Sequence, residues 1–284
     1  MDAALTVTVL NFAYQGLVLA LVVLGLGIVF GMLGVMNMAH GEFLMIGAYC
    51  AVAVQNAGLP VLWGAALAIL VCGALGCLTH YVLIRRLYNR PFDTLLATWG
   101  LSILLRKLVE LVYGRGYQNV ESPVSGGMTV FGVEYPGYRL FLIAAIVVLF
   151  AVLALWYWRS STGARLRAMI SNPILAQAVG IDTNRLACAA FMCGVISAGV
   201  AGALLAPMVR VAPGMGLDYL LNSFFVLVVG GLGSLAGLAA GTGIVSGTQL
   251  LFATLFDQTS GYLAVLGISI IFLWLKPDGL ISRR

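Results

Sequence analysis

Apolar runs close to the length of a membrane crossing follow one another through the whole chain, and most of them contain no charged residue. These runs lie at about 7–30, 43–55, 60–84, 92–113, 138–158, 186–208, 218–240, 243–256 and 261–275. A crossing helix needs about 20 mostly apolar residues, so several runs are too short for a full crossing. We therefore expect an all-α, polytopic membrane protein with about eight to nine crossings, some of them broken or re-entrant. Residues 1–284 are expected to form a single membrane domain.

The composition supports this interpretation and excludes other classes. Hydrophobic residues make up 62% of the chain and charged residues only 9%, whereas soluble globular domains carry about 25% charged residues. The net charge of +5 is too dilute for a nucleic-acid surface. The first residues, Met1–Ala4, lack the basic region of a signal peptide, so the first run is expected to remain as a crossing. All five cysteines lie in apolar runs, and we interpret them as small hydrophobic residues.

Basic residues next to the runs predict the orientation in the membrane. They gather in two connections and at the C-terminus: Arg85, Arg86 and Arg90; Arg159, Arg165, Arg167 and Arg185; and Lys276, Arg283 and Arg284. Because Lys and Arg stay on the cytoplasmic side, we expect the C-terminus inside the cell and the N-terminus outside. An outer loop is then expected at about 114–137 and a cytoplasmic segment at about 159–185.

Three polar residues interrupt the apolar sequence between 31 and 42, namely Asn37, His40 and Glu42. This polar, glycine-rich stretch leads into the short run from Phe43, which we expect to be half of a broken helix. An ionisable group at membrane depth is costly unless it is paired or reaches water, so it indicates a functional site. These residues either line a transport path or form a structural lock at a helix start, and the sequence leaves both open. A metal site is not expected, because His40 and Glu42 point to different faces and the other histidine, His80, lies in another run.

Glycines recur at four-residue spacing at Gly233, Gly237 and Gly241, which allows a second helix to approach closely. The denser cluster Gly230-Gly231-Leu232-Gly233-Ser234 predicts a second break in a helix.

The cytoplasmic segment is predicted to hold two short helices. Ser160–Thr162 can cap the first near Gly163, Asn172-Pro173 interrupts it, and Gly180 ends the second. Such helices either lie on lipid with arginines facing phosphates or dock a cytoplasmic partner, and both interpretations remain open. No catalytic constellation and no phosphate-binding loop is present in the sequence, so we do not expect an enzyme.

Several separated motifs resemble one family. The sequence G-V-M-N-M-A-H-G-E at Gly34–Glu42 closely resembles the signature of ABC-importer permeases for branched-chain amino acids and urea. The resemblance extends, in the right order, to Leu95–Ser102, Gly163–Ala168, Gly180-Ile181, Val229–Gly237 and Lys276–Leu280. Within the family, Leu95–Ser102, Gln118–Glu121 and Asn222–Phe224 are most similar to the urea and short-chain amide branch.

This resemblance implies a permease subunit in a bacterial inner membrane, paired with a second, homologous permease subunit. Two cytoplasmic ATPase subunits would bind ATP and Mg, a periplasmic binding protein would deliver the substrate, and this chain would hold no cofactor. The expected substrate is urea or a short-chain amide, with branched-chain amino acids as the alternative. A stand-alone secondary transporter or channel is a further rival.

The site residues follow from these arguments. The expected substrate path comprises Asn37, His40, Glu42, Thr98, Ser102 and Asn222. The expected ATPase-coupling residues are Gly163, Arg165, Leu166, Arg167, Ala168, Asn172, Ala176 and Gly180, of which Arg165, Leu166 and Ala168 are expected to contact the ATPase. The expected helix-packing residues are Gly230, Gly231, Gly233, Gly237 and Gly241.

Overall fold

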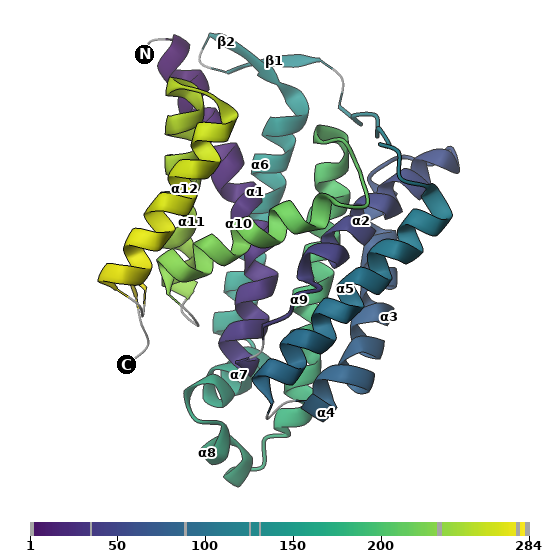
Figure 1. Cartoon of the computed structure of the whole chain (residues 1–284), viewed down its shortest axis with the longest axis vertical. Coiled ribbons are helices and arrows are strands. Elements are labelled where there is room, and N and C mark those ends of the chain that lie inside the picture. Colours follow the sequence, from purple (N-terminus) through teal and green to yellow (C-terminus); the bar gives the residue numbers. More distant parts are fainter. Residues whose placement is uncertain are drawn as a thin grey trace.

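The computed structural model describes residues 3–34, 36–87, 90–124, 126–130, 132–231, 235–276 and 279–281, and this part of the chain is mostly helical (Figure 1). The longer helices are α1 (Ala3–Leu33), α2 (His40–Asn56), α3 (Trp63–Thr79), α5 (Pro91–Tyr113), α6 (Gly137–Arg159), α9 (Thr183–Leu205), α10 (Met215–Gly230), α11 (Leu235–Leu255) and α12 (Gln258–Leu275). A π-helical turn at His80–Ile84 joins α3 to α4 (Arg85–Leu87), and a 3-10 turn at Ala206–Met208 follows α9. The connection between α6 and α9 contains α7 (Ser161–Ser171) and α8 (Pro173–Ala178).

Among the described residues, six helices are long and apolar enough to cross a membrane: 4–31, 63–87, 137–159, 183–208, 236–255 and 258–275. Helix α5 has 23 residues but carries Asp93, Arg106, Lys107 and Glu110. Helices α2 and α10 have only 17 and 16 residues. The predicted all-α, polytopic fold is therefore confirmed, whereas about eight to nine crossings exceeds the number of helices with the length and hydropathy of a full crossing.

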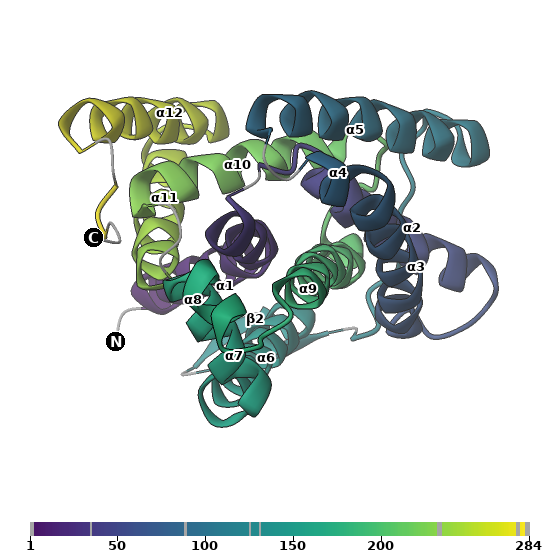
Figure 2. The same cartoon turned by 90° about the horizontal axis from the view of Figure 1, so that it is seen from below.

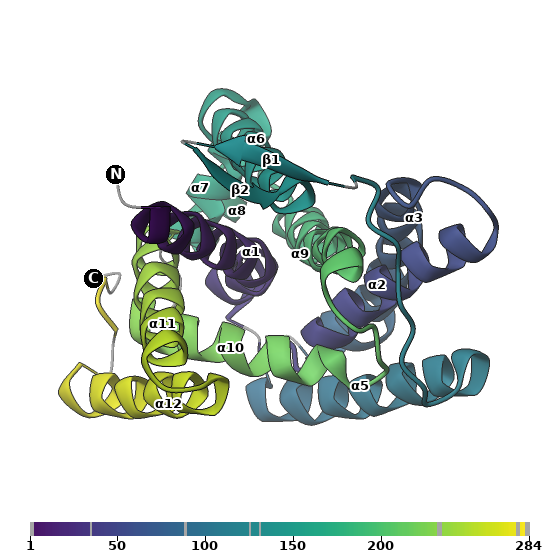
Figure 3. The same ribbon diagram turned by 90° about the horizontal axis from the view of Figure 1, so that it is seen from above.

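Helices α1 and α9 lie side by side in the centre of the molecule, as the two end-on views show (Figures 2 and 3). Helices α2 and α3 pack on one side of this pair, and α10, α11 and α12 extend to the other side. Helix α10 runs obliquely across the bundle, behind α5 and α12 (Figures 1 and 2). The buried apolar side chains form one cluster around α2, α3 and α9 and a second around α1, α10, α11 and α12.

The two ends of the bundle differ in character. The start of α1 and the β-hairpin lie at one end, which we call the hairpin end, while α4, α7 and α8 lie at the other, which we call the basic end (Figure 1). Arg85, Arg159 and Arg165 therefore lie at the same end, as the distribution of basic residues predicts. Helix α12 also runs toward the basic end (Figure 1).

The predicted outer loop contains a hairpin that the sequence did not indicate. Strands β1 (Gly127–Val130) and β2 (Val133–Pro136) pair antiparallel, with Gly127 opposite Pro136 and Val130 opposite Val133. A bridge between Gln118 and Val211 ties the preceding segment to the connection between α9 and α10. Glycine and polar residues favour a loop over a strand, which explains why this hairpin was missed.

The apolar run predicted at 218–240 is wrong as a single segment, because it joins the end of α10 to the start of α11. Helix α10 ends at Gly230, and Gly231 takes a φ of +101°, a backbone conformation that favours glycine. The predicted second break therefore lies where the glycines cluster. Residues 232–234, which include the predicted packing residue Gly233, lie outside the described residues.

Candidate functional site

The segment between α1 and α2 brings the chain back along α1 before α2 begins. Gly34 follows α1 with a φ of +62°, and its N–H donates to Phe30 O at 2.8 Å. His40, the first residue of α2, places Nε2 3.0 Å from Val22 O. Val22 lies about 16 Å along the helix axis from the C-terminal end of α1. Because His40 contacts Val22, α2 begins well inside the bundle, away from both of its ends. The predicted broken helix is thus present, although Val35 lies outside the described residues.

Asn37 and Thr98 satisfy the backbone of this segment. Asn37 is fully buried, and its Oδ1 accepts from Ala39 N at 3.0 Å. Met38 N donates to Thr98 Oγ1 at 3.1 Å, so α5 also supports the segment. Irregular backbone at membrane depth needs such partners, because lipid offers none. Both residues were predicted to line the path, and in this structure their side-chain oxygens bind the protein's own backbone.

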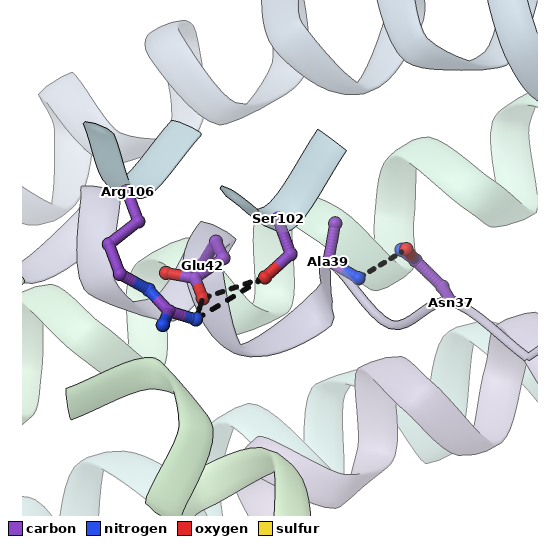
Figure 4. A network of polar contacts seen from close by, with 5 residues as sticks. All are labelled: Asn37, Ala39, Glu42, Ser102 and Arg106. Carbon is purple, nitrogen blue, oxygen red and sulfur yellow. Dashed lines mark hydrogen bonds and ion pairs between the residues drawn. The ribbon is translucent and has the colours of Figure 1, made fainter. Parts of the chain in front are cut away.

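Glu42 forms polar contacts with two side chains of α5 (Figure 4). Its Oε1 accepts from Ser102 Oγ at 2.9 Å and from Arg106 Nη2 at 2.5 Å. The Glu42 side chain is 2% exposed and the Arg106 side chain 22%. A charge-assisted bond of this kind is roughly twice as strong as a neutral one, so it joins the start of α2 firmly to α5.

Arg106 is the functional candidate that the sequence reasoning missed. Thr94, Thr98 and Ser102 are buried at four-residue spacing on α5, and Arg106 continues the same row. Residues four apart share one face of a helix, so this polar row is a signal that the sequence contains. The expected substrate path included Thr98 and Ser102 of this row but not Arg106. It lies about 10 Å inside the hairpin end of α5, counted from Tyr113.

Several buried polar atoms around the start of α2 have no hydrogen-bond partner among the described residues. They are Asn37 Nδ2, His40 Nδ1, Glu42 Oε2 and Arg106 Nε, and Tyr49 OH, further along α2, is also without a partner in the described part of the chain. Native structures leave few buried polar atoms unpaired, so a cluster of them calls for an explanation. Glu42 Oε2 and Arg106 Nε belong to the same ion pair, so this pair is held by one atom of each side chain, Oε1 and Nη2.

Glycines allow α2 to approach its neighbours at this depth. A Cβ on Gly41 would collide with the Gly216 carbonyl of α10, and one on Gly47 would collide with the Gly199 carbonyl of α9. Gly202 is equally close to the Leu44 carbonyl. Backbone contact of this kind fixes the position of the start of α2 relative to α9 and α10.

The structure brings five predicted path residues together and leaves one apart. Asn37, His40, Glu42, Thr98 and Ser102 are all buried around the start of α2. Asn222 is half-buried on α10, and its side chain makes no hydrogen bond with any described residue. It is not part of the polar network of Figure 4.

The segment between α6 and α9 folds as two capped helices. Ser160 Oγ accepts from Gly163 N at 2.9 Å and caps α7, while Asn172 Oδ1 accepts from Leu175 N at 3.0 Å and caps α8. The chain leaves α8 through Gly180, which has a φ of +84°. The predicted interruption at Asn172 and the stop at Gly180 are thus both present.

The residues of this segment divide into an inner and an outer set. Gly163, Leu166 and Ala176 are buried, and a Cβ on Gly163 would collide with the Tyr157 carbonyl. Arg167 bonds to that same carbonyl, and its guanidinium lies 5.1 Å from the ring centres of Tyr157 and Trp158.

Arg165, Ala168, Asn172 and Gly180 are exposed. Three apolar side chains join them: Ile174 at 80%, Leu175 at 59% and Val179 at 69%. The exposed surface of α7 and α8 therefore combines Arg165 with an apolar patch that the sequence reasoning did not include.

The glycine pattern at 230–241 packs α10 against α11. A Cβ on Gly230 would collide with the Gly237 carbonyl, and one on Gly241 would lie 2.5 Å from Val226 O. Gly231 is close to Gly279 of the C-terminal tail, whose neighbour Leu280 donates to Val229 O at 3.0 Å. These glycines therefore fix both the α10–α11 contact and the docking of the tail.

No metal centre is formed by the described residues, which contain no group of three or more His, Cys, Asp or Glu side chains able to share an ion. The two histidines lie apart, His40 at the start of α2 and His80 in the π-helical turn. Each of the five cysteines is free.

Comparison with known proteins gives a match over nearly the whole chain. A family model described as branched-chain amino acid transport system / permease component matches residues 8–274. The high-affinity branched-chain amino acid transport system permease protein BraD of Pseudomonas aeruginosa is 28% identical over 93% of this chain and 91% of its own length. The permease protein LivH of Escherichia coli, named for the same kind of system, is 28% identical over 96% and 94%. LivM of Salmonella typhimurium is 25% identical over 91% of this chain and 66% of its own length.

One solved structure shares the fold. It is described as PsaBC from Streptococcus pneumoniae in complex with Fab, and it superposes with a TM-score of 0.53 over 94% of this chain and 91% of that one. The sequences are only 12% identical, so the likeness concerns the arrangement of the helices alone.

Proposed function

The chain belongs to the family of branched-chain amino acid transport system permease components, and we propose that it is the membrane-spanning subunit of an ATP-driven importer for branched-chain amino acids. The observation that carries this proposal is the match over residues 8–274, combined with relatives that align over more than nine-tenths of both lengths. Members of this family are permeases without catalytic activity of their own.

The substrate is the point on which sequence motifs and relatives differ. Leu95–Ser102, Gln118–Glu121 and Asn222–Phe224 favour urea or a short-chain amide. BraD, LivH and LivM are named for branched-chain amino acids, and none of them is named for urea. Because a match along the whole chain outweighs three short segments, we propose branched-chain amino acids as the substrate and retain urea or a short amide as the second candidate.

The proposed partners follow from the same comparison. LivH and LivM of Salmonella typhimurium are two different permease proteins named for one type of system, and both resemble this chain. We therefore propose a second, homologous permease subunit as the membrane partner. Two cytoplasmic ATPase subunits would bind ATP and Mg, since this chain has no phosphate-binding loop, and a periplasmic binding protein would deliver the amino acid. The assembly would lie in a bacterial inner membrane.

The exposed surface of α7 and α8 is the proposed contact with the ATPases. It lies at the basic end, where the positive-inside rule places the cytoplasm (Figure 1). Arg165 offers an exposed charge, and Ile174, Leu175 and Val179 offer an apolar patch. An exposed apolar patch rimmed by polar residues is typical of a protein interface. Movement of this segment would pass through α6 and α9, which flank it in the chain, to the centre of the bundle.

Transport in proteoliposomes tests the proposal. The complete complex, reconstituted with its binding protein outside and ATP inside, is expected to accumulate labelled leucine, isoleucine and valine. Urea and acetamide serve as alternative substrates, and vesicles without ATP serve as the control for a channel. Uptake of urea instead of leucine would favour the second candidate. Uptake by this chain alone, without ATP or partners, would contradict both.

A further inference from the structure

Glu42 and Arg106 form a monodentate ion pair, although their side chains could form two parallel hydrogen bonds. The bond joins Oε1 of the carboxylate to Nη2 of the guanidinium, while Oε2 and Nε are buried and have no partner among the described residues. If the pair served only to stabilise the fold, a bidentate geometry, in which Nε also donates to Oε2, would give a stronger interaction. The structure thus leaves one acceptor and one donor free in the same place.

The two residues differ in their access to the surroundings. Glu42 is 2% exposed and is held by Ser102 Oγ and by its place in the first turn of α2, where the helix dipole stabilises a carboxylate. Arg106 is 22% exposed and is the more accessible partner. A ligand can therefore approach the pair from the Arg106 side while Glu42 keeps its other contacts.

The same stretch of α5 presents apolar side chains beside the guanidinium. Ile103 is 50% exposed and Trp99 55%, and they precede Arg106 by three and seven residues, which places all three on one helix face. A cation beside an apolar surface matches a molecule with a carboxylate and an apolar side chain.

We propose that the Glu42–Arg106 pair is a subsite for a zwitterionic α-amino acid, which replaces the direct ion pair as it passes. Its carboxylate accepts from the Arg106 guanidinium, its ammonium donates to Glu42, and its side chain lies along Ile103 and Trp99. Each charge keeps an opposite partner throughout the exchange, which is the condition for an ion at membrane depth. This inference rests on the proposed function, because it assumes that the substrate is an amino acid.

The test compares three ligands that differ only in their charged groups. L-leucine carries both charges, L-leucinamide lacks the carboxylate, and 4-methylpentanoate lacks the ammonium. Thermal unfolding of the purified complex in nanodiscs, without binding protein, is measured at millimolar concentration of each. Leucine is expected to raise the unfolding temperature more than either analogue. Equal shifts for all three ligands, or no shift with leucine, would overturn the proposal.

Variants assign each charge to its partner. In Arg106→Gln, leucine and leucinamide are expected to give equal shifts, whereas in Glu42→Gln leucine and 4-methylpentanoate are expected to become equal. Lys107→Gln is the matched control, because it removes a neighbouring charge of α5 that pairs with Glu110 at 2.7 Å, and it should keep the wild-type pattern. A purely structural pair would lower all three responses together, which would contradict the proposal.

If Arg106→Gln and Glu42→Gln do not assemble, Arg106→Lys provides the test. A lysine keeps the charge but lacks the planar fork of donors that binds a carboxylate through two hydrogen bonds. The preference for leucine over leucinamide is expected to fall at least threefold, and an unchanged preference would count against the subsite. ATP-driven leucine uptake by the wild-type complex with its binding protein is measured in parallel. If uptake persists while the wild type shows no ligand preference, the subsite is wrong and the proposed function stands.

Discussion

Glu42 of α2 and Arg106 of α5 lie 2.5 Å apart at membrane depth, sixty-four residues apart in the chain. Their contact joins the re-entrant start of α2 to α5, which also supports the preceding segment through Thr98 Oγ1. The pair therefore carries both a structural and, as we propose, a substrate-binding role.

Removing the acidic partner is expected to destabilise the protein strongly. In Glu42→Ala the Arg106 guanidinium loses its counter-ion, and breaking a buried pair in this way costs about 3–5 kcal/mol. Lys107→Ala removes an exposed neighbour and is expected to change stability little. Denaturant unfolding of the complex measures both. The double variant Glu42→Ala/Arg106→Met should recover part of the loss, and a further loss in the double variant would contradict an ion-pair effect.

The start of α2 should tolerate no side chain at Gly41. A Cβ there would meet the backbone of Gly216, so Gly41→Ala is expected to cost about 1–3 kcal/mol or more through overpacking. Gly100→Ala on α5 is the matched control, because nothing lies within 4 Å of its Cβ, and it should stabilise the helix by about 0.5–1 kcal/mol. Equal effects of the two substitutions on the unfolding midpoint would refute the close α2–α10 contact.

Arg165 and Arg167 are expected to behave differently although they are two residues apart. Arg165→Glu reverses an exposed charge and should reduce ATP-driven uptake by at least tenfold without changing the unfolding temperature. Arg167→Ala removes contacts to Tyr157 and Trp158 and should lower the unfolding temperature instead. Uptake and differential scanning fluorimetry distinguish the two. Normal uptake in Arg165→Glu would refute the proposed ATPase contact.

The cap of α12 should make a small part of the stability pH-dependent. The Ser260 hydroxyl and backbone N–H hold the pKa of the Asp257 carboxyl below its usual range. This contribution is present above the unfolded pKa of about 3.9 and is lost as pH falls through the lower folded pKa. Asp257→Asn keeps a capping oxygen but does not titrate, so its unfolding temperature should fall less than that of the wild type below about pH 4. Identical pH profiles would show that the cap does not contribute.

Much of the helix order could be predicted from hydropathy alone. The apolar runs at 7–30, 60–84 and 186–208 correspond to α1, α3 with its π-helical turn, and α9. The polar, glycine-bearing segment before Phe43 correctly indicated a break, because such backbone is tolerated at membrane depth only where protein surrounds it. The caps of α7 and α8 could likewise be located, since Ser160 and Asn172 are residues that satisfy free helix N–H groups.

Other features depend on contacts between distant segments, which a single sequence does not record. The ion pair of Glu42 could not be predicted, because its partner Arg106 lies sixty-four residues away and only the packing of α5 beside α2 brings the two together. Leu166 was expected to contact an ATPase, but it is only 8% exposed, because α7 turns this side chain toward the bundle. The β-hairpin was missed because its strands are short and held by pairing with each other rather than by burial.

The proposed ATPase contact requires that the basic end of the bundle faces the cytosol. A membrane-impermeant maleimide tests this in intact cells, with the native cysteines replaced and single cysteines introduced as Tyr117→Cys at the hairpin end or Arg165→Cys on α7. Tyr117 is 69% exposed and Arg165 is also exposed, so both positions can react. We predict labelling of Tyr117→Cys in intact cells, and of Arg165→Cys only after the membranes are opened and the ATPases removed. Labelling of Arg165→Cys in intact cells would contradict the account.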